Sequence, residues 1–411
     1  MLYEFRSGKE LLGNIGVPQH ANPNIPQDNN LASQHKLRLC YISNPNIVHT
    51  RRWVNWFVKC GHTVCLLADV PLKEPWTDVP IIDLSKIFYA PIIRFPIWTV
   101  WLRRFLRQWN PDILHAHRVN SAGWLMAASG FHPCIVTPWG SDVLIQAQHS
   151  SIARLLARFT LRRADLITTI SQAIGEQVIQ LGARAESLKP VHVGVELDIF
   201  NPYVPTHQES RELRQHLSVP VNARLVLSIR AVHPIYNLDI IMRAIPFVHQ
   251  QFPDAYFIFA DYNTNPDYKK QLDELIKELG FEAFVRWLPP TSSRIEMAER
   301  YCLSDVVVSV PSSDGGTPVS VLEAMACGKP VVCSDLPAVR EFITSGENGW
   351  LVPVRQAIPL AEAINQLLAH PGQAIEFGRR ANQVVADNAN LEVEMRRMEA
   401  IYYQLAGSRR R

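Results

Sequence analysis

Residues 311–335 combine the residue types of an anion-binding turn. We expect an apolar strand to end at Val310 and a Ser/Gly-rich turn to follow, before Thr317 and Pro318 open a helix, because proline costs least in the first helical turn. Free N–H groups in this stretch and the positive end of the helix dipole would together hold a phosphate. The expected phosphate-binding residues are Gly316, Thr317, Pro318, Val319 and Ser320.

Glu323 lies about one helical turn beyond this site. A carboxylate cannot favour a phosphate by charge, but its oxygens can accept hydrogen bonds from a vicinal diol such as that of a ribose. A phosphate site beside a diol acceptor indicates a nucleotide. The alternative on these residues alone is an ordinary strand–turn–helix crossover with a solvated glutamate.

Polar side chains also follow strands expected in the first half of the chain. His117 ends an apolar run in which His115 holds the alternate strand position. His49 and Arg52 follow the first expected strand, where a cation could approach an acceptor or a phosphate. The alternatives are a core histidine with satisfied hydrogen bonds and, for His49 and Arg52, a solvated helix start.

These candidates sit at the ends of strands that alternate with helical patterns. Short apolar strands are expected at residues 37–43, 62–68, 112–115, 134–137 and 166–170, and again at 225–229, 256–260, 284–287, 306–310, 330–334 and 350–353. This alternation predicts an α/β protein with two doubly wound parallel sheets covered by helices. Ligands of such sheets lie beyond the carboxyl ends of the strands, so two facing sheets would enclose a binding cleft.

A polar, proline-containing stretch separates the two series of strands. We predict a last helix over residues 386–411, with a basic end, that crosses back to the first domain. The other predicted parts are a flexible leader over residues 1–34, a first Rossmann-like domain over 35–203, a linker over 204–222 and a second Rossmann-like domain over 223–385.

Composition restricts the class of protein. The 411 residues include 41 Lys and Arg against 38 Asp and Glu, and this net charge of +3 does not favour a nucleic-acid-binding protein. The seven cysteines form no Cys-x-x-Cys pair, which favours reduced thiols in a cytosolic protein over zinc or disulfides. We expect no signal peptide, no membrane-spanning segment and a cytoplasmic location, and the residues point to no particular oligomeric state.

Residues 311–335 resemble the donor-nucleotide motif of retaining GT-B glycosyltransferases of the glycosyltransferase family 4 type, and the resemblance extends from about Leu37 to Leu405. It implies the GT-B architecture, in which two Rossmann-like domains face each other across a cleft. Supporting pieces, in the family's order, are His49–Trp53, Gly61–Val64, Pro111–His117, Thr137–Asp142, Ala164–Asp165, Ile170–Ser171, Val193–Phe200, Arg230, Asn237–Asp239, Ser304–Asp305, Glu323–Gly328 and Gly346–Gly349.

The resemblance implies roles for the donor residues. Glu323 matches the glutamate that binds the nucleotide ribose, and Arg230 matches the arginine that binds the diphosphate, where a guanidinium offsets charge on the leaving group. A second family glutamate, near the transferred sugar, would fall at Gly315, so Asp314 is the expected catalytic substitute.

The family's lysine aligns with Tyr236 in this chain. A phenol can donate a hydrogen bond but brings no positive charge, and His233 or Arg286 could supply it instead. In the first half, His117 matches the family's active-site histidine. The segment Gly140, Ser141 and Asp142, after a tryptophan where relatives often have histidine, is expected to form a loop near the substrate.

The leading hypothesis is therefore a glycosyltransferase that moves a sugar from a nucleotide-sugar donor to a hydroxyl of a polysaccharide, glycolipid or small-molecule acceptor. The resemblance implies retention of the anomeric configuration without a cofactor, and the lack of an Asp-x-Asp triplet agrees with a reaction that needs no metal. The alternatives are a non-catalytic nucleotide-sugar-binding subunit and a nucleotide-sugar epimerase. A nicotinamide-dependent oxidoreductase is disfavoured, because Ser-Asn-Pro-Asn follows the first strand instead of Gly-x-Gly-x-x-Gly.

An apolar stripe with helical spacing precedes the run that ends at His117. Arginines lie beside it, a composition that fits either packing against the sheet or peripheral binding to an anionic membrane, which would be the inner face of the cell membrane. The stripe comprises Trp98, Trp101, Leu102, Phe105, Leu106 and Trp109, and the arginines are Arg103, Arg104 and Arg107.

Overall fold

The first described sheet has seven parallel strands in the order β3-β2-β1-β4-β5-β6-β7. The computed structural model describes residues 35–73, 79–87, 94–203 and 207–409, so the predicted leader lies outside the described residues. The strands are β1 Arg38–Ser43, β2 Thr63–Ala68, β3 Ile81–Asp83, β4 Ile113–His117, β5 Cys134–Thr137, β6 Leu166–Thr169 and β7 Leu188–Pro190.

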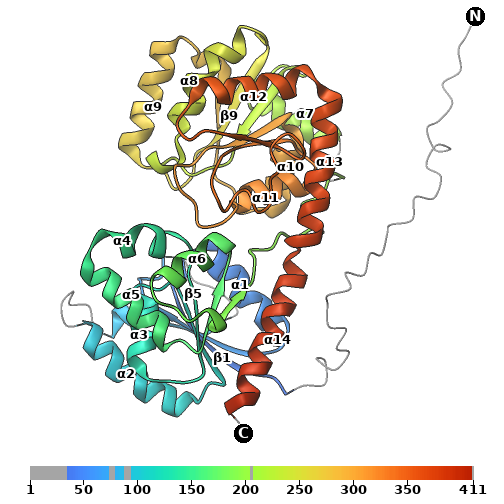
Figure 1. Cartoon of the computed structure of the whole chain (residues 1–411). Helices are drawn as coiled ribbons and strands as arrows, with labels where there is room; N and C mark the ends of the chain where they lie inside the picture. The colour runs from blue at the N-terminus through green and yellow to red at the C-terminus, as the bar shows by residue number, and fades with distance from the viewer. Residues whose placement is uncertain (1–34, 74–78, 88–93, 204–206, 410–411) are drawn as a thin grey trace, which may run out of the picture. The chain divides into compact units, whose positions relative to one another are not determined.

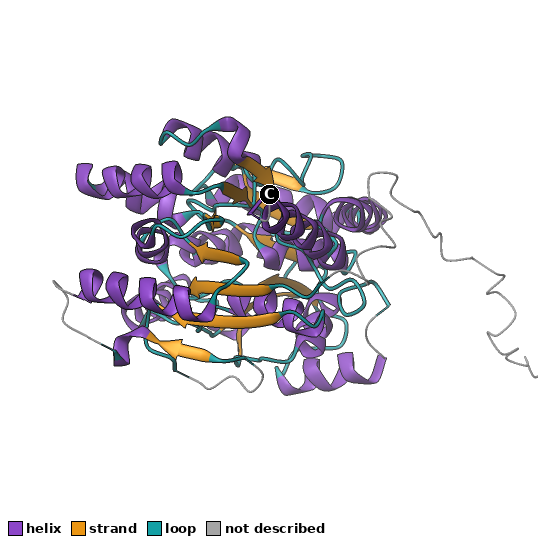
Figure 2. Ribbon diagram, turned by 90° about the horizontal axis from the view of Figure 1, so that it is seen from below, coloured by secondary structure: helices purple, strands orange, loops and turns teal. Residues whose placement is uncertain are grey.

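Helices connect these strands and cover both faces of the sheet (Figures 1 and 2). Strands β4, β5 and β6 are buried along their whole length, as expected for parallel strands with helices on each side. The helices are α1 Val48–Lys59, α2 Arg94–Trp109, α3 Ser121–Ser129, α4 Ala147–His149, α5 Ser151–Arg163 and α6 Gln172–Gln180.

The second described sheet has six parallel strands in the order β10-β9-β8-β11-β12-β13. Its strands are β8 Arg224–Ser228, β9 Ala255–Ala260, β10 Val285–Leu288, β11 Val306–Ser309, β12 Val331–Ser334 and β13 Trp350–Val352. The helices are α7 His207–His216, α8 Leu238–His249, α9 Pro266–Leu279, α10 Arg294–Leu303, α11 Val319–Ala326, α12 Ala357–Ala369 and α13 Pro371–Asn388.

Two doubly wound parallel sheets confirm the predicted fold class. Every strand predicted from the sequence is present to within two residues, and the structure adds β3 and β7. These two strands have three residues each and lie at the two edges of the first sheet, so neither carries a long enough apolar run to be recognised.

The last helix, α14 Leu391–Arg409, packs against the first sheet rather than the second. Met398 and Tyr402 of this helix are fully buried with Leu39 and Tyr41 of β1. The Tyr402 hydroxyl lies 3.0 Å from that of Tyr41. The first sheet therefore has a core completed by the end of the chain.

Candidate active site

The candidate residues follow the strands at which each sheet reverses its winding. The strand order changes direction between β1 and β4 in the first sheet and between β8 and β11 in the second. Loops beyond the carboxyl ends of such strand pairs diverge and leave room for a ligand. His49 and Arg52 lie on α1 after β1, His117 ends β4 and Arg230 follows β8. The predicted Ser/Gly-rich turn, residues 311–318, follows β11 and is called the donor turn below.

The donor turn leads into α11, which begins at Val319, one residue after Pro318. The Pro318 carbonyl accepts two hydrogen bonds from the first helical turn. The N–H groups of Val319 and Ser320 have no acceptor within the helix, as at any α-helix N-terminus, and are available to an anion. Thr317 has a different task, because its hydroxyl donates to the Ala338 carbonyl at 2.8 Å and fixes the turn.

Arg230 contacts three other predicted site residues, namely Asp314, Ser320 and Tyr236. Its guanidinium is 2.9 Å from the Asp314 carboxylate and 3.4 Å from the Ser320 hydroxyl. It also lies over the Tyr236 ring, 4.2 Å from the ring centroid, in a cation–π contact. The structure thus places a cation, an aromatic ring and a hydroxyl at the start of α11, with one carboxylate that neutralises the cation.

The backbone contact between Gly140 and Gly315 explains why no side chain follows Asp314. A Cβ atom built on Gly315 would lie 2.4 Å from the Gly140 Cα, and one built on Gly140 would lie 2.6 Å from the Gly315 Cα. Gly140 also has a φ of +113°, which favours glycine. A glutamate at position 315 has no space in this arrangement, so a carboxylate in this turn must come from a neighbour such as Asp314.

A hydrogen bond from Ser171 and a contact with Ile170, both in the first half of the chain, hold the same turn, and another hydrogen bond reaches Glu341 after β12. The Ser171 hydroxyl donates to the Gly315 carbonyl at 2.6 Å, and Gly316 lies against Ile170. On α6, the Gln172 N–H donates to the Glu341 carboxylate at 2.8 Å. The donor turn is therefore supported by residues from both sheets.

Glu323 is almost completely buried and both of its carboxylate oxygens are already hydrogen-bonded. Arg294 donates to one oxygen at 2.6 Å, and the Tyr301 hydroxyl donates to the other at 3.1 Å. Both partners lie on α10. The sequence analysis missed them, since the only available signal is an arginine and a tyrosine seven positions apart on one expected helix.

His117 and His49 lie in an aromatic cluster at the ends of β1 and β4. The His117 ring contacts those of Trp53 and Trp139 edge-on at 5.3 Å and 5.7 Å, and the His49 ring stacks on Trp139 at 5.3 Å. Burial lowers the pKa of His117 to about 3. Burial and the charges of nearby arginines lower the pKa of His49 to about 4, so both rings are neutral near pH 7.

Asp142 shapes the loop after β5 rather than facing a ligand. Its carboxylate accepts the N–H groups of Trp139 at 3.1 Å, Gly140 at 3.0 Å and Val119 at 2.8 Å. Ser141 is exposed on the same loop. Of the three loop residues predicted here, Asp142 and Gly140 hold the backbone against the donor turn and Ser141 projects outward.

Several buried polar atoms at this site have no hydrogen-bond partner among the described residues. They belong to both ring nitrogens of His117, to His49 Nδ1, and to the Nε atoms of Arg52 and Arg230. Arg52 is otherwise held by the Gly194 carbonyl at 3.0 Å. Because unpaired buried polar atoms are costly, their concentration here favours a polar ligand that would complete them.

Arg286 does not supply the missing positive charge. Its guanidinium donates to the carbonyls of Leu217 at 2.7 Å and Ala283 at 2.9 Å, near the amino end of β10 and away from the donor turn. His233 is exposed and its ring meets that of Tyr236 edge-on at 6.5 Å. The additional cation close to the site is Arg294, which with Arg52 and Arg230 lowers the pKa of His49.

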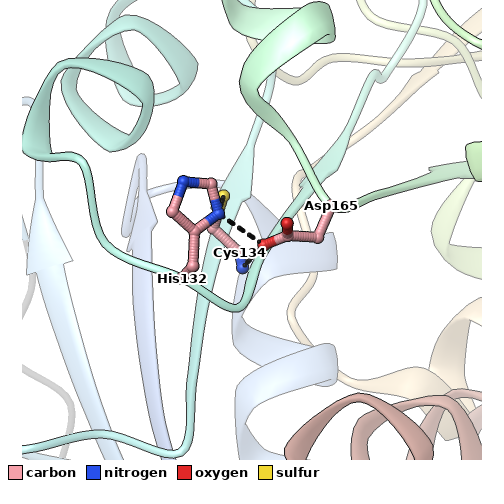
Figure 3. Close-up of side chains that lie close together, drawn as sticks. All are labelled: His132, Cys134 and Asp165. Carbon is pink, nitrogen blue, oxygen red and sulfur yellow. Dashed lines mark hydrogen bonds and ion pairs between the residues drawn. The ribbon is translucent and has the colours of Figure 1, made fainter. Parts of the chain in front are cut away.

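Among the described residues, one group of potential metal ligands occurs at the amino ends of β5 and β6, opposite the strand ends that carry the candidate site. Figure 3 shows His132, Cys134 and Asp165, with ligand atoms all within 4.8 Å of one another. Asp165 already accepts the Cys134 N–H at 2.7 Å and contacts the His132 ring at 2.8 Å. Cys134 begins β5 and Asp165 precedes β6, so these contacts pin two strand starts together, and the group lies apart from the residues described above.

Two family models match the chain. The model of the glycosyl transferase 4-like family matches residues 38–171, and that of the glycosyl transferases group 1 family matches residues 209–384. The chain is 31% identical over 275 residues to the D-inositol 3-phosphate glycosyltransferase of Mycobacterium tuberculosis, a match that covers 62% of this chain and 54% of that protein. The matched region spans less than two thirds of the length of the curated relatives.

Solved structures share the fold at lower sequence identity. A glycosyltransferase from Rickettsia africae superposes with a TM-score of 0.78 at 16% identity, covering 90% of this chain and 99% of that one. Anabaena HepE, solved in complex with UDP and glucose, superposes with a TM-score of 0.76 at 18% identity, covering 90% and 100%. These similarities establish the GT-B fold of the chain.

Proposed function

We propose that the chain, whose two halves match family models of glycosyl transferases, transfers a sugar from a nucleotide-sugar donor to an acceptor hydroxyl. The observation that carries the proposal is the cluster of Arg230, Ser320 and Tyr236 at the N-terminus of α11, with Glu323 one turn further on. Helix-terminal amides and a guanidinium suit a diphosphate, and a buried carboxylate suits a ribose diol. The complex of HepE with UDP and glucose makes UDP the first nucleotide to test.

Each part of the cluster has a task in this reaction. The amides of Val319 and Ser320, together with Arg230, stabilise the negative charge that grows on the departing nucleoside diphosphate. Asp314 lies beside Arg230, where its carboxylate can face the positive charge that develops on the transferred sugar. No metal is needed in this scheme, because a guanidinium and helix-terminal amides meet the charge of the leaving group.

The acceptor approaches from the side of β1 and β4. Neutral His117 offers two unpaired ring nitrogens there, and Trp139 offers an aromatic face of the kind that packs against sugar C–H groups. We propose a retaining reaction, in which leaving group and acceptor occupy the same face of the sugar. Measuring the anomeric configuration of the product by NMR checks this part independently.

A donor screen tests the function. The chain is incubated with UDP-, GDP- and ADP-sugars and released nucleoside diphosphate is measured, with and without EDTA. We expect release from one nucleotide class, unchanged by EDTA; strict dependence on a divalent ion would contradict the metal-free scheme. Arg230→Met should abolish both binding and release, whereas Arg379→Met, at an exposed position on α13, should change neither.

The second candidate is a non-catalytic nucleotide-sugar-binding subunit. The observation that favours it is that this chain has Gly315 and Tyr236 at the two positions where the resemblance to the family implies a glutamate and a lysine. Calorimetry of nucleotide-sugar binding, read beside the release of nucleoside diphosphate, separates the two candidates. The subunit would bind nucleotide-sugar but release no nucleoside diphosphate with any acceptor. Turnover in the parent chain would exclude it.

We further propose that the first domain binds an anionic membrane surface through α5. In α2, by contrast, Trp98, Leu102 and Leu106 are buried against the sheet, so the stripe seen in the sequence belongs to the core. No helix in the described part of the chain is long and apolar enough to cross a bilayer. A glycolipid-modifying enzyme with such a surface would meet its acceptor at the membrane.

Helix α5 exposes three large apolar side chains, whereas α2 exposes Ile97 and Val100. Ile152, Leu155 and Phe159 are 73%, 66% and 40% exposed. The same helix contains four arginines and no acidic residue, and at least Arg154 and Arg158 are exposed. Exposed apolar side chains beside arginines are typical of helices that lie in the interface of anionic lipid.

Vesicle co-sedimentation tests this surface. At low salt we expect binding to vesicles with a third phosphatidylglycerol and none to pure phosphatidylcholine. The triple variant Ile152→Ser, Leu155→Ser and Phe159→Ser should lose binding while nucleotide affinity stays unchanged. Equal sedimentation of parent and variant would show that α5 is not the contact surface.

A further inference from the structure

A chain of four charged side chains runs from α1 to α11. Arg52 on α1 is 3.3 Å from Glu196, Glu196 is 2.7 Å from Arg294, and Arg294 is 2.6 Å from Glu323. Glu196 lies between β7 and α7, in the segment that leaves the first sheet. The chain of charges therefore reaches the buried carboxylate of α11 from outside its own helix.

Contacts within the protein fix the position of the Arg294 guanidinium. Its Nε and one terminal nitrogen both donate to the same oxygen of Glu196, at 3.0 Å and 2.7 Å. Its guanidinium also lies over the Phe200 ring, 4.5 Å from the centroid. A planar guanidinium can contact two carboxylates and a ring face together, whereas a lysine ammonium on a flexible stem cannot hold all three.

The fixed guanidinium sets the orientation of the Glu323 carboxylate. Arg294 occupies one lone pair of one oxygen, and the Tyr301 hydroxyl occupies one lone pair of the other. Each carboxylate oxygen retains a second lone pair. Two free lone pairs, one on each oxygen of a fixed carboxylate, suit the two adjacent hydroxyls of a ribose.

We propose that Arg294 is a positioning residue that presents Glu323 to the ribose hydroxyls of the donor nucleotide, with Glu196 as its anchor. The inference rests on the proposed nucleotide-sugar function and adds the source of selectivity for a ribose over a deoxyribose. Arg294 acts through Glu323 and does not contact the diphosphate in this scheme.

Paired nucleotides test the proposal. Dissociation constants are measured by calorimetry for a nucleoside diphosphate and for its 2′,3′-dideoxy analogue, with the base that the parent chain binds best. The parent should prefer the ribose form by about a hundredfold, since each hydrogen bond to a charged group is worth roughly tenfold or more in affinity. In Arg294→Ala this preference should fall below about tenfold, while the affinity for the dideoxy analogue changes by less than about threefold.

Further variants separate positioning from folding. Arg294→Lys keeps the positive charge but loses the planar set of guanidinium N–H donors. Its preference for ribose should therefore lie between those of the parent and Arg294→Ala. Glu196→Gln removes the anchor and should lower the preference several-fold, even if Arg294→Ala fails to fold. Arg380→Ala on α13, an exposed arginine in an ion pair, should leave the preference unchanged.

The outcomes are distinct. Equal weakening of both nucleotides in Arg294→Ala would overturn the proposal, because it would mean that Arg294 acts on the diphosphate or on the fold alone. Full preference for ribose in Arg294→Lys and Glu196→Gln would also overturn it. Failure of the parent to bind any nucleoside diphosphate would instead contradict the proposed function.

Discussion

Asp314→Asn should slow the reaction and at the same time tighten the binding of nucleoside diphosphate. Asp314 and Arg230 form an ion pair at 2.9 Å, with side chains 25% and 11% exposed. The aspartate therefore neutralises the cation that we assign to the diphosphate. Removing its charge leaves Arg230 without a partner until a phosphate arrives.

The size of the effect follows from the burial of the pair. Exposed ion pairs contribute about 0–1 kcal/mol, whereas breaking a fully buried pair costs about 3–5 kcal/mol. The exposed fractions of Asp314 and Arg230 place their pair between these limits, so we expect a loss of about 1–2 kcal/mol in the free energy of unfolding without ligand. A diphosphate would restore much of this energy, which corresponds to roughly tenfold tighter binding.

Calorimetry with nucleoside diphosphate, thermal unfolding with and without it, and nucleotide release provide the measurements. The variant should unfold at a lower temperature when free, show a larger stabilisation by nucleotide, and turn over at least about a hundredfold more slowly, because a group facing transition-state charge is lost. Asp254→Asn is the matched control. Asp254 pairs with Arg224 at the amino end of β8, away from the site, and should alter neither binding nor turnover.

Weaker nucleotide binding by Asp314→Asn would refute this reasoning, because it would show that Asp314 supports the diphosphate site instead of opposing it. Unchanged turnover would refute the catalytic role of Asp314. The reaction would then use no carboxylate from the donor turn.

Three further predictions concern pH, the glycine contact and the last helix. His117 is neutral and has a pKa of about 3, below the value of about 6.5 for an unfolded chain, so stability should fall as the pH drops below 6.5, by about 1.4 kcal/mol per unit from this ring; urea unfolding of the parent and His117→Asn at pH 7 and 5.5 measures it. Gly140→Ala should lower turnover by more than tenfold, since its Cβ would press on the Gly315 backbone. Tyr402→Phe should cost about 1–3 kcal/mol in unfolding free energy, because it removes the partner of buried His115 at 2.6 Å.

Matched variants control these three experiments. Parent and His117→Asn losing equal stability on acidification would contradict the assignment to this ring. Gly372→Ala, where an added Cβ meets nothing within 4 Å, should leave turnover unchanged, and equal effects at the two glycines would contradict the steric explanation. Tyr203→Phe alters a side chain that is 93% exposed. A comparable loss of unfolding free energy there would show that the loss in Tyr402→Phe does not come from the buried hydrogen bond of its hydroxyl.

The predicted strands could be read from the sequence because parallel strands buried on both faces must be continuous apolar runs, as in Val306–Ser309 and Val331–Ser334. Short edge strands carry no such signal, and β3 was missed for this reason. The donor turn was equally readable, since a strand, a Ser/Gly turn and a helix that opens after proline are local features.

Burial and contacts between residues far apart in the sequence could not be predicted in this way. The stripe on α2 favoured the core as a pattern but also fitted a membrane surface, and packing showed that Trp98 is buried. The exposed Ile152 and Leu155 of α5 attract no notice in the sequence. Likewise Arg286 was a reasonable candidate cation until its guanidinium proved to bind backbone carbonyls.

The sequence by itself determined two doubly wound sheets, because local periodicity acts between neighbours in the chain. It predicted the phosphate-binding turn from local turn chemistry, and Arg230 and Glu323 through the resemblance to the family. Only the tertiary structure decided that Arg294 holds Glu323 and that Asp314 neutralises Arg230. The physical reason is that an ion pair depends on where two folded segments meet, and 84 residues separate Arg230 from Asp314 along the chain. Neither spacing nor composition shows where these segments meet. The strand order of the second sheet decides it, because it places β8 beside β11.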